Sequence, residues 1–244
     1  MPRNYLRLSV AHICPGLLNT DSGNILAFKN RCEWRNIDVE VEAIEDGTRL
    51  NPRKYDFYFI GSGPESHYKL ASEELYSHRE NLYKACQKDA LILGVGAGYF
   101  LLGNYYQPIE GEILAGIGIF DIRTLEAEKR FTGNTLAKAG FLSPKTVVGF
   151  ENNNCLTYLG DDAEPFMQIS RGKGNNGEDK TEGARLNNTF GTYFHGPILP
   201  KNPQLCDYFI TLTLNRKYED DFELASLDDD IEKHAHRDGV LTKY

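Results

Sequence analysis

Residues Leu91 to Gly103 read LILGVGAGYFLLG, and this stretch decides the fold. An apolar run of strand length passes through closely spaced glycines directly into the start of a helix. This pattern is typical of a nucleophile elbow, in which the central residue has a strained backbone angle at a helix N-terminus. The central position here is Gly96, which has no side chain. The sequence therefore predicts an elbow that lacks its nucleophile.

The flanking segments extend this unit into an alternation of strands and helices. Apolar or branched runs predict strands, and amphipathic stretches between them predict helices. The alternation indicates an α/β fold with an open, mainly parallel sheet covered by helices. The predicted strands are Tyr5–Ile13, Ile37–Ile44, Asp56–Ile60 and Ala90–Val95, and the predicted helices are Asn24–Arg35, Ser72–Lys88 and one from about Tyr99.

The second half of the chain has a less regular pattern. Short strands are predicted at Thr146–Phe150, Leu156–Leu159 and Thr189–Phe194, and a closing helix at Gln204–Leu214. The polar, glycine-rich segment Arg171–Glu182 predicts a loop. We expect one domain over residues 1–217, followed by an acidic tail over residues 218–244.

Composition excludes several classes of function. The net charge of −8 and the pI near 5.3 provide no basic surface for nucleic acid or anionic membranes. No apolar stretch is long enough to span a bilayer. The five cysteines are scattered and show no CxxC spacing, so the sequence predicts no disulfide framework and no metal site, and a reducing cytoplasm fits best. No cofactor is predicted.

Two further features belong with the elbow. His195 follows a predicted strand and would be the matching base, and Gly61-Ser62-Gly63 follows another strand and would supply an oxyanion donor. Simpler interpretations stay open: a turn at the glycine loop, a structural role for His195, and a phosphate-binding loop at Gly94–Gly98. Against the phosphate loop, no ribose-binding acid follows Gly94–Gly98 at the end of a strand about 20 residues on.

With these features in place, the chain resembles the class I glutamine amidotransferases of the cobyric acid synthase (CobB/CobQ) type. Within them it resembles GatD, the glutaminase subunit of lipid II isoglutaminyl synthase. The resemblance covers roughly Leu8 to Leu214. The matching segments are Ala11–Arg31, Phe57–Glu65, Leu114–Asp121, Arg130–Asn134, Val147–Asn152, Gly172–Arg185 and Gly191–Asn202.

The resemblance implies a three-layer α/β sandwich in which a Cys–His pair hydrolyses glutamine through an acyl-enzyme. Ammonia then passes to a Mur-ligase-like partner of the MurT type, which amidates the D-glutamate of lipid II in peptidoglycan synthesis. The family cysteine falls on Gly96, the family histidine on His195, and a substrate-contacting arginine on Arg130. The oxyanion loop falls on Gly61–Gly63, where Ser62 replaces a glycine.

Other departures lie near the same end of the fold. After the elbow position come Ala97 and Gly98, and Phe100 replaces a family glutamine. Asn153 and Leu156 stand where the family commonly has histidine and arginine. These differences predict a subunit that has lost glutaminase activity, that binds a Mur-ligase-like partner, and whose pocket holds glutamine or a related small molecule.

Two alternatives stay open. The first is an active amidotransferase with displaced chemistry, which uses Cys155 as its thiol or takes ammonia from solution. The second is a phosphate- or nucleotide-binding module in which the Gly94–Gly98 turn binds the anion.

Overall fold

The structure is a computed structural model that describes residues 5–45 and 47–242. In these residues a central six-stranded sheet has the order β11-β12-β4-β3-β1-β2, and all neighbouring strands are parallel except β11 and β12. The mainly parallel sheet predicted from the sequence is therefore confirmed. Its strands are β1 (Leu6–Ile13), β2 (Ile37–Ile44), β3 (Phe57–Ile60), β4 (Leu91–Val95), β11 (Ala184–Leu186) and β12 (Thr189–Thr192).

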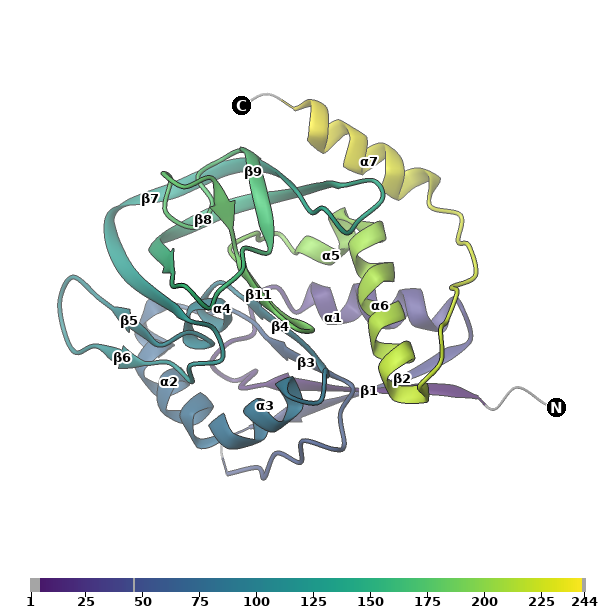
Figure 1. The fold of residues 1–244 in the computed structure, drawn as a ribbon, viewed down its shortest axis with the longest axis horizontal. Helices are drawn as coiled ribbons and strands as arrows, with labels where there is room; N and C mark the ends of the chain where they lie inside the picture. Colours follow the sequence, from purple (N-terminus) through teal and green to yellow (C-terminus); the bar gives the residue numbers. More distant parts are fainter. Residues whose placement is uncertain (1–4, 46, 243–244) are drawn as a thin grey trace.

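Helices cover both faces of this sheet and give the predicted three-layer sandwich (Figure 1). In β3, Phe57 and Phe59 pack in one apolar core with α1 and α6, while Tyr58 and Ile60 pack in a second core with α2 and α3. All four side chains are fully buried, as expected for a strand covered on both sides. The helices are α1 (Gly23–Glu33), α2 (Tyr68–Ser77), α3 (Arg79–Cys86), α4 (Ala97–Leu101), α5 (Ile198–Lys201), α6 (Pro203–Tyr218) and α7 (Asp230–Leu241), with a 3-10 turn at Glu65–His67.

A second, largely antiparallel sheet lies beside the first, and the sequence did not predict it. Its order is β10-β9-β7-β5-β6, with β8 paired to β7. The long strand β8 joins the two short strands predicted at residues 146–150 and 156–159. The strands of this sheet are β5 (Tyr105–Gln107), β6 (Leu114–Ala115), β7 (Ile122–Lys138), β8 (Thr146–Leu159), β9 (Met167–Arg171) and β10 (Thr181–Glu182).

The helix predicted over Ser72–Lys88 is wrong as a single element. The chain instead forms α2 and α3, separated by His78. The backbone amide of His78 still bonds to Leu75, and the amide of Leu82 restarts the pattern from His78. The break lets both helices turn apolar residues, such as Leu75 and Leu82, into the same core.

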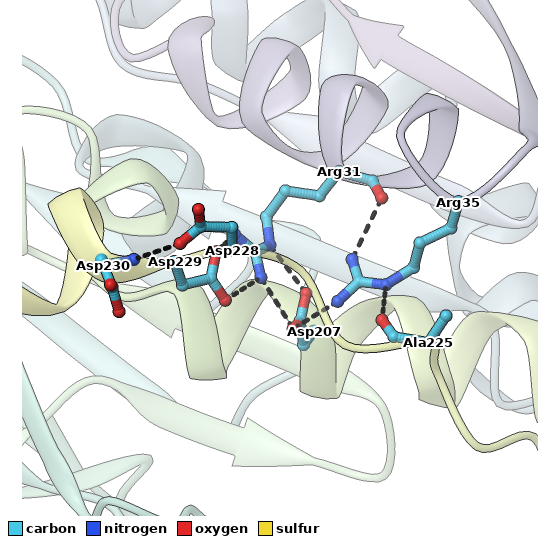
Figure 2. A network of polar contacts seen from close by, with 7 residues as sticks. All are labelled: Arg31, Arg35, Asp207, Ala225, Asp228, Asp229 and Asp230. Carbon is cyan, nitrogen blue, oxygen red and sulfur yellow. Dashed lines mark hydrogen bonds and ion pairs between the residues drawn. The ribbon is translucent and has the colours of Figure 1, made fainter.

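The segment after α6 returns along the domain and ends in α7 close to α5 (Figure 1). Buried Arg31 of α1 holds it: the guanidinium pairs with Asp207 of α6 at 2.7 Å and with Asp229 at 2.6 Å (Figure 2). Arg35 donates to the carbonyl oxygen of Ala225 in the same segment. The acidic residues predicted as a tail therefore include a carboxylate that neutralises a buried cation.

Candidate active site

The turn between β4 and α4 has the geometry of a nucleophile elbow. Gly96 stands between the strand and the helix with φ of 57° and ψ of −112°. A positive φ has no steric cost for glycine but strains a residue that has a Cβ atom. The Gly96 amide donates a hydrogen bond of 2.9 Å to the Thr192 carbonyl oxygen, so the neighbouring strand β12 holds the turn. The central residue of the turn carries no reactive group.

The loop after β3 packs against the segment that follows β1. Thr20 and Ser62 form an isolated antiparallel bridge, with 2.9 Å between the Thr20 amide nitrogen and the Ser62 carbonyl oxygen. A Cβ atom added at Gly61 or Gly63 would lie 2.5 or 2.1 Å from a carbonyl oxygen of residues 17–20. Because these distances are far below van der Waals contact, both positions require glycine, and the loop has no room to move toward residues 17–20.

The backbone amides of the elbow all donate to oxygen atoms of the protein. The Ala97 amide donates to the Ser62 hydroxyl at 3.1 Å, and the Gly98 amide donates to the Gly61 carbonyl oxygen at 3.0 Å. The Gly96 amide is bound to Thr192, as described above. An anion nest needs amides that point at the ligand. This arrangement therefore argues against a phosphate loop at Gly94–Gly98.

His195 faces the elbow and is oriented by a carboxylate. Its Nδ1 lies 2.7 Å from Asp21 Oδ2, and the Gly196 amide donates to Asp21 Oδ1 at 2.9 Å. A proton on Nδ1 satisfies this contact and leaves the lone pair on Nε2, the tautomer a general base needs. The amide of His195 also donates to the Phe150 carbonyl oxygen at 2.8 Å, so strand β8 fixes its backbone.

The predicted site residues line one cavity of about 640 Å³, with one exception. Gly61 lies behind the others, against Leu18 and Thr20. The cavity is framed by the elbow, by the loop after β3, by the middle of β8 and by the segment around His195. The predicted residues in its wall are Ser62, Gly63, Gly96, Ala97, Phe100, Arg130 and His195.

Arg130 reaches this cavity from β7. Its guanidinium donates to Glu65 Oε1 at 2.9 Å and to the Asn152 carbonyl oxygen at 3.2 Å. The Arg130 and Glu65 side chains are each about half exposed, 47% and 50%. Such a pair contributes little to stability but leaves the arginine accessible to an anionic group of a ligand.

Phe100 gives this wall of the cavity an aromatic character. Its ring stacks on Tyr106 with centroids 4.5 Å apart, and it meets Tyr68 edge to face at 5.1 Å. The Phe100 side chain is buried, so the aromatic cluster is part of the core as well as of the cavity wall. A side chain with no polar atoms thus stands where the resemblance implies an amide.

Cys155 also contacts the cavity, but it lacks the surroundings of a reactive thiol. Burial raises the pKa of Cys155 to about 12, and a hydrogen bond with Tyr193 lowers this pKa by a smaller amount. Its backbone amide donates to the Asn153 side-chain oxygen at 3.0 Å, which fixes the strand there. A thiol attacks as the thiolate, so a protonated, buried sulfur is a poor nucleophile.

Three charged residues that line the cavity, Asp21, Glu65 and Lys201, were missed by the sequence analysis. Asp21 lies within the matching segment Ala11–Arg31, but nothing local signals its contact with a histidine 174 residues away. Lys201 lies at the end of α5, inside a segment that carries the resemblance, and burial lowers its pKa. Within residues 5–45 and 47–242 no group of three or more His, Cys, Asp or Glu side chains could hold a metal ion.

A buried carboxyl supports β12 behind the elbow. Glu182 accepts hydrogen bonds from the Thr192 hydroxyl and, at 2.9 Å, from the Tyr193 amide. Its second carboxyl oxygen is buried and has no hydrogen-bond partner in the described part of the chain. Burial raises the pKa of Glu182 to about 8, so at neutral pH this carboxyl is largely protonated.

These features have counterparts in known proteins. The sequence profile of the CobB/CobQ-like glutamine amidotransferase domain matches residues 9–203, and the chain belongs to this family. GatD, a subunit of the glutamine-hydrolysing lipid II isoglutaminyl synthase, is 36% identical in Staphylococcus aureus, with 93% of each chain covered. The Streptococcus pneumoniae GatD is 34% identical over 93% of this chain and 88% of its own.

Solved structures agree on the fold. A crystal structure of a glutamine amidotransferase aligns with a TM-score of 0.55 and 15% identity, over 83% of this chain and 98% of the other. A glutamine amidotransferase of Thermotoga maritima aligns with a TM-score of 0.54 and 12% identity, over 98% and 94% of the two chains. None of the helices in the described part of the chain has the length and apolar character needed to cross a bilayer.

Proposed function

We propose that this chain is a GatD-like subunit that has lost glutaminase activity and serves a Mur-ligase-like partner in lipid II amidation as a binding or regulatory subunit. The observation that carries the proposal is the elbow itself. Its backbone is formed, and His195 with its carboxylate stands beside it, but Gly96 offers no thiol. Covalent catalysis on an amide needs a nucleophile within reach of the base.

The other sulfur at the cavity does not replace it. Cys155 is fully buried and keeps its proton near neutral pH, because burial raises its pKa to about 12. The cavity itself is retained, with Arg130 at its edge and about 640 Å³ of space. We infer that it binds glutamine or a related small molecule without hydrolysing it, and that the chain works in the cytoplasm, where its five free cysteines stay reduced.

The direct test is a glutaminase assay on the chain purified together with its Mur-ligase-like partner. We expect no glutamate release from glutamine, whereas the Staphylococcus aureus GatD complex, assayed in parallel, provides the positive control. Binding of glutamine by calorimetry, with Arg130→Ala as the comparison, reports separately on the cavity. Normal turnover of glutamine by the wild-type complex would refute the proposal.

An active amidotransferase that uses Cys155 as its thiol, or ammonia from solution, is the second candidate function, because Cys155 does contact the cavity. In that case Cys155→Ser should abolish glutamine-dependent amidation by the complex. If the partner takes ammonia from solution, ammonium chloride should support amidation while glutamine does not, and Cys155→Ser should have no effect. The same assay, run with the two nitrogen sources, separates these outcomes.

A further inference from the structure

Ser62 occupies the place that a side chain at position 96 needs. A Cβ atom built on Gly96 would lie 2.6 Å from Ser62 Oγ, 2.8 Å from Ser62 Cβ and 2.9 Å from His195 Cε1. Real Cβ atoms essentially never approach another atom this closely. Even the smallest side chain at position 96 therefore requires one of its neighbours to move.

Rotation of the Ser62 side chain does not relieve the contact. The hydroxyl can turn away, but Ser62 Cβ is placed by the backbone. That backbone is held by the bridge to Thr20 and by the close approach of Gly61 and Gly63 to residues 17–20. The imidazole of His195 is at the end of a side chain and has more freedom. The rigid obstacle is therefore the β-carbon of residue 62.

The Ser62 hydroxyl also occupies the chemical position of a bound oxyanion. It accepts the Ala97 amide hydrogen at 3.1 Å. In an active elbow, the amide after the nucleophile donates to the oxyanion of the tetrahedral intermediate. Here that donor is already satisfied by a neutral side chain.

We propose that Ser62 closes the former nucleophile site, because its side chain fills the volume needed at position 96 and its hydroxyl takes the Ala97 amide. Positions 62 and 96 are coupled as a result: a thiol at 96 is accommodated only together with glycine at 62. The view of Gly96 as a former nucleophile position rests on the proposed function, whereas the packing conflict between the two positions does not.

The packing conflict is tested by thermal unfolding of a double-mutant cycle. Gly96→Ala should lower the melting temperature by roughly 3–10 °C with Ser62 present. In the Ser62→Gly background the same substitution should lower the melting temperature by several degrees less. In the Ser62→Ala background it should lower the melting temperature as much as with serine, because the Cβ of residue 62 remains. Backbone strain at position 96 is common to all backgrounds and cancels in the comparison.

Two results would overturn the coupling. One is an equal loss in all three backgrounds, including a failure to fold in each. The other is that Ser62→Ala restores the melting temperature of the Gly96→Ala protein as fully as Ser62→Gly does. A Gly96→Ala protein that fails to fold supports the coupling when Ser62→Gly restores a folded protein, and overturns it when Ser62→Gly does not.

Thiol reactivity tests the chemical half of the proposal. Iodoacetamide at pH 7 should alkylate the thiol introduced in Ser62→Gly/Gly96→Cys at least about tenfold faster than the one in Gly96→Cys, because the freed amide and helix N-terminus favour the thiolate. Equal rates would overturn it. A wild-type complex that hydrolyses glutamine would remove the proposed function and leave the unfolding cycle intact, so the two failures are distinguishable.

Discussion

Replacing Glu182 by glutamine should remove a pH-dependent loss of stability. This carboxyl is fully buried behind β12 and accepts hydrogen bonds from the Thr192 hydroxyl and the Tyr193 amide. A glutamine side chain keeps an acceptor oxygen for both donors and cannot ionise. Its NH₂ group replaces a carboxyl oxygen that is buried without a partner in the described residues, which adds an offset that does not vary with pH.

The magnitude follows from the two pKa values. Burial raises the Glu182 pKa from 4.5 to about 8 in the folded state. Below pH 4.5 both states bind the proton, and stability is unaffected. Between pH 4.5 and 8 the folded state binds one proton more than the unfolded state, so the free energy of unfolding falls by up to about 1.4 kcal/mol per pH unit. Above pH 8 the loss is complete, on the order of 5 kcal/mol.

The measurement is urea denaturation followed by circular dichroism at pH 5, 6.5 and 8. The free energy of unfolding of Glu182→Gln minus that of the wild type should increase by roughly 3 kcal/mol between pH 5 and pH 8. Glu178→Gln, at an exposed position near the same loop, is the matched control and should show no such increase. A difference for Glu182→Gln that stays constant with pH would refute the reasoning.

Three further predictions concern other buried groups. Arg31→Met leaves Asp229 without its guanidinium partner and Asp207 with only that of Arg35, so it should lower the free energy of unfolding in urea by about 3–5 kcal/mol. Lys29→Met removes an exposed pair on the same helix and should cost less than about 1 kcal/mol; similar losses for the two variants would contradict this. Asp21→Ala removes the acceptor of the Gly196 amide and should cost about 1–3 kcal/mol by thermal unfolding, so an unchanged melting temperature counts against the His195 contact. Cys155 should resist iodoacetamide at pH 7.5, with a thiolate fraction on the order of 10⁻⁴ or less, and react once urea unfolds the chain; rapid alkylation of the folded protein would mean that its thiol is ionised.

The parallel half of the fold could be predicted because its signals are local. The run at Leu91–Val95 is apolar at every position but Gly94, as a strand buried on both faces must be. The glycines at Gly94, Gly96 and Gly98 each allow a close backbone approach or a positive φ. These requirements act over a few residues, so they leave a readable pattern.

The second sheet depends on contacts that no local window contains. β8 passes through Asn152–Asn154, residues that are depleted in strands, and pairing with β7 holds it there. Further along, the Thr157 amide of β8 donates to the Asn175 carbonyl oxygen. The Asp21–His195 contact spans 174 residues in the same way. Long-range pairing overrides local preference in both cases, and a single sequence does not display it.

The contact between positions 62 and 96 restricts the order in which substitutions at these two positions can occur. As long as serine occupies position 62, a mutation that places a side chain at position 96 brings its β-carbon to 2.8 Å from that of Ser62. By the coupling proposed above, such a mutation is opposed by packing alone. A side chain at position 96 then becomes acceptable only after Ser62 has been replaced by glycine, and that first replacement brings no catalytic benefit by itself. Under the proposed function, the β-carbon of one serine therefore opposes the return of a nucleophile to the elbow.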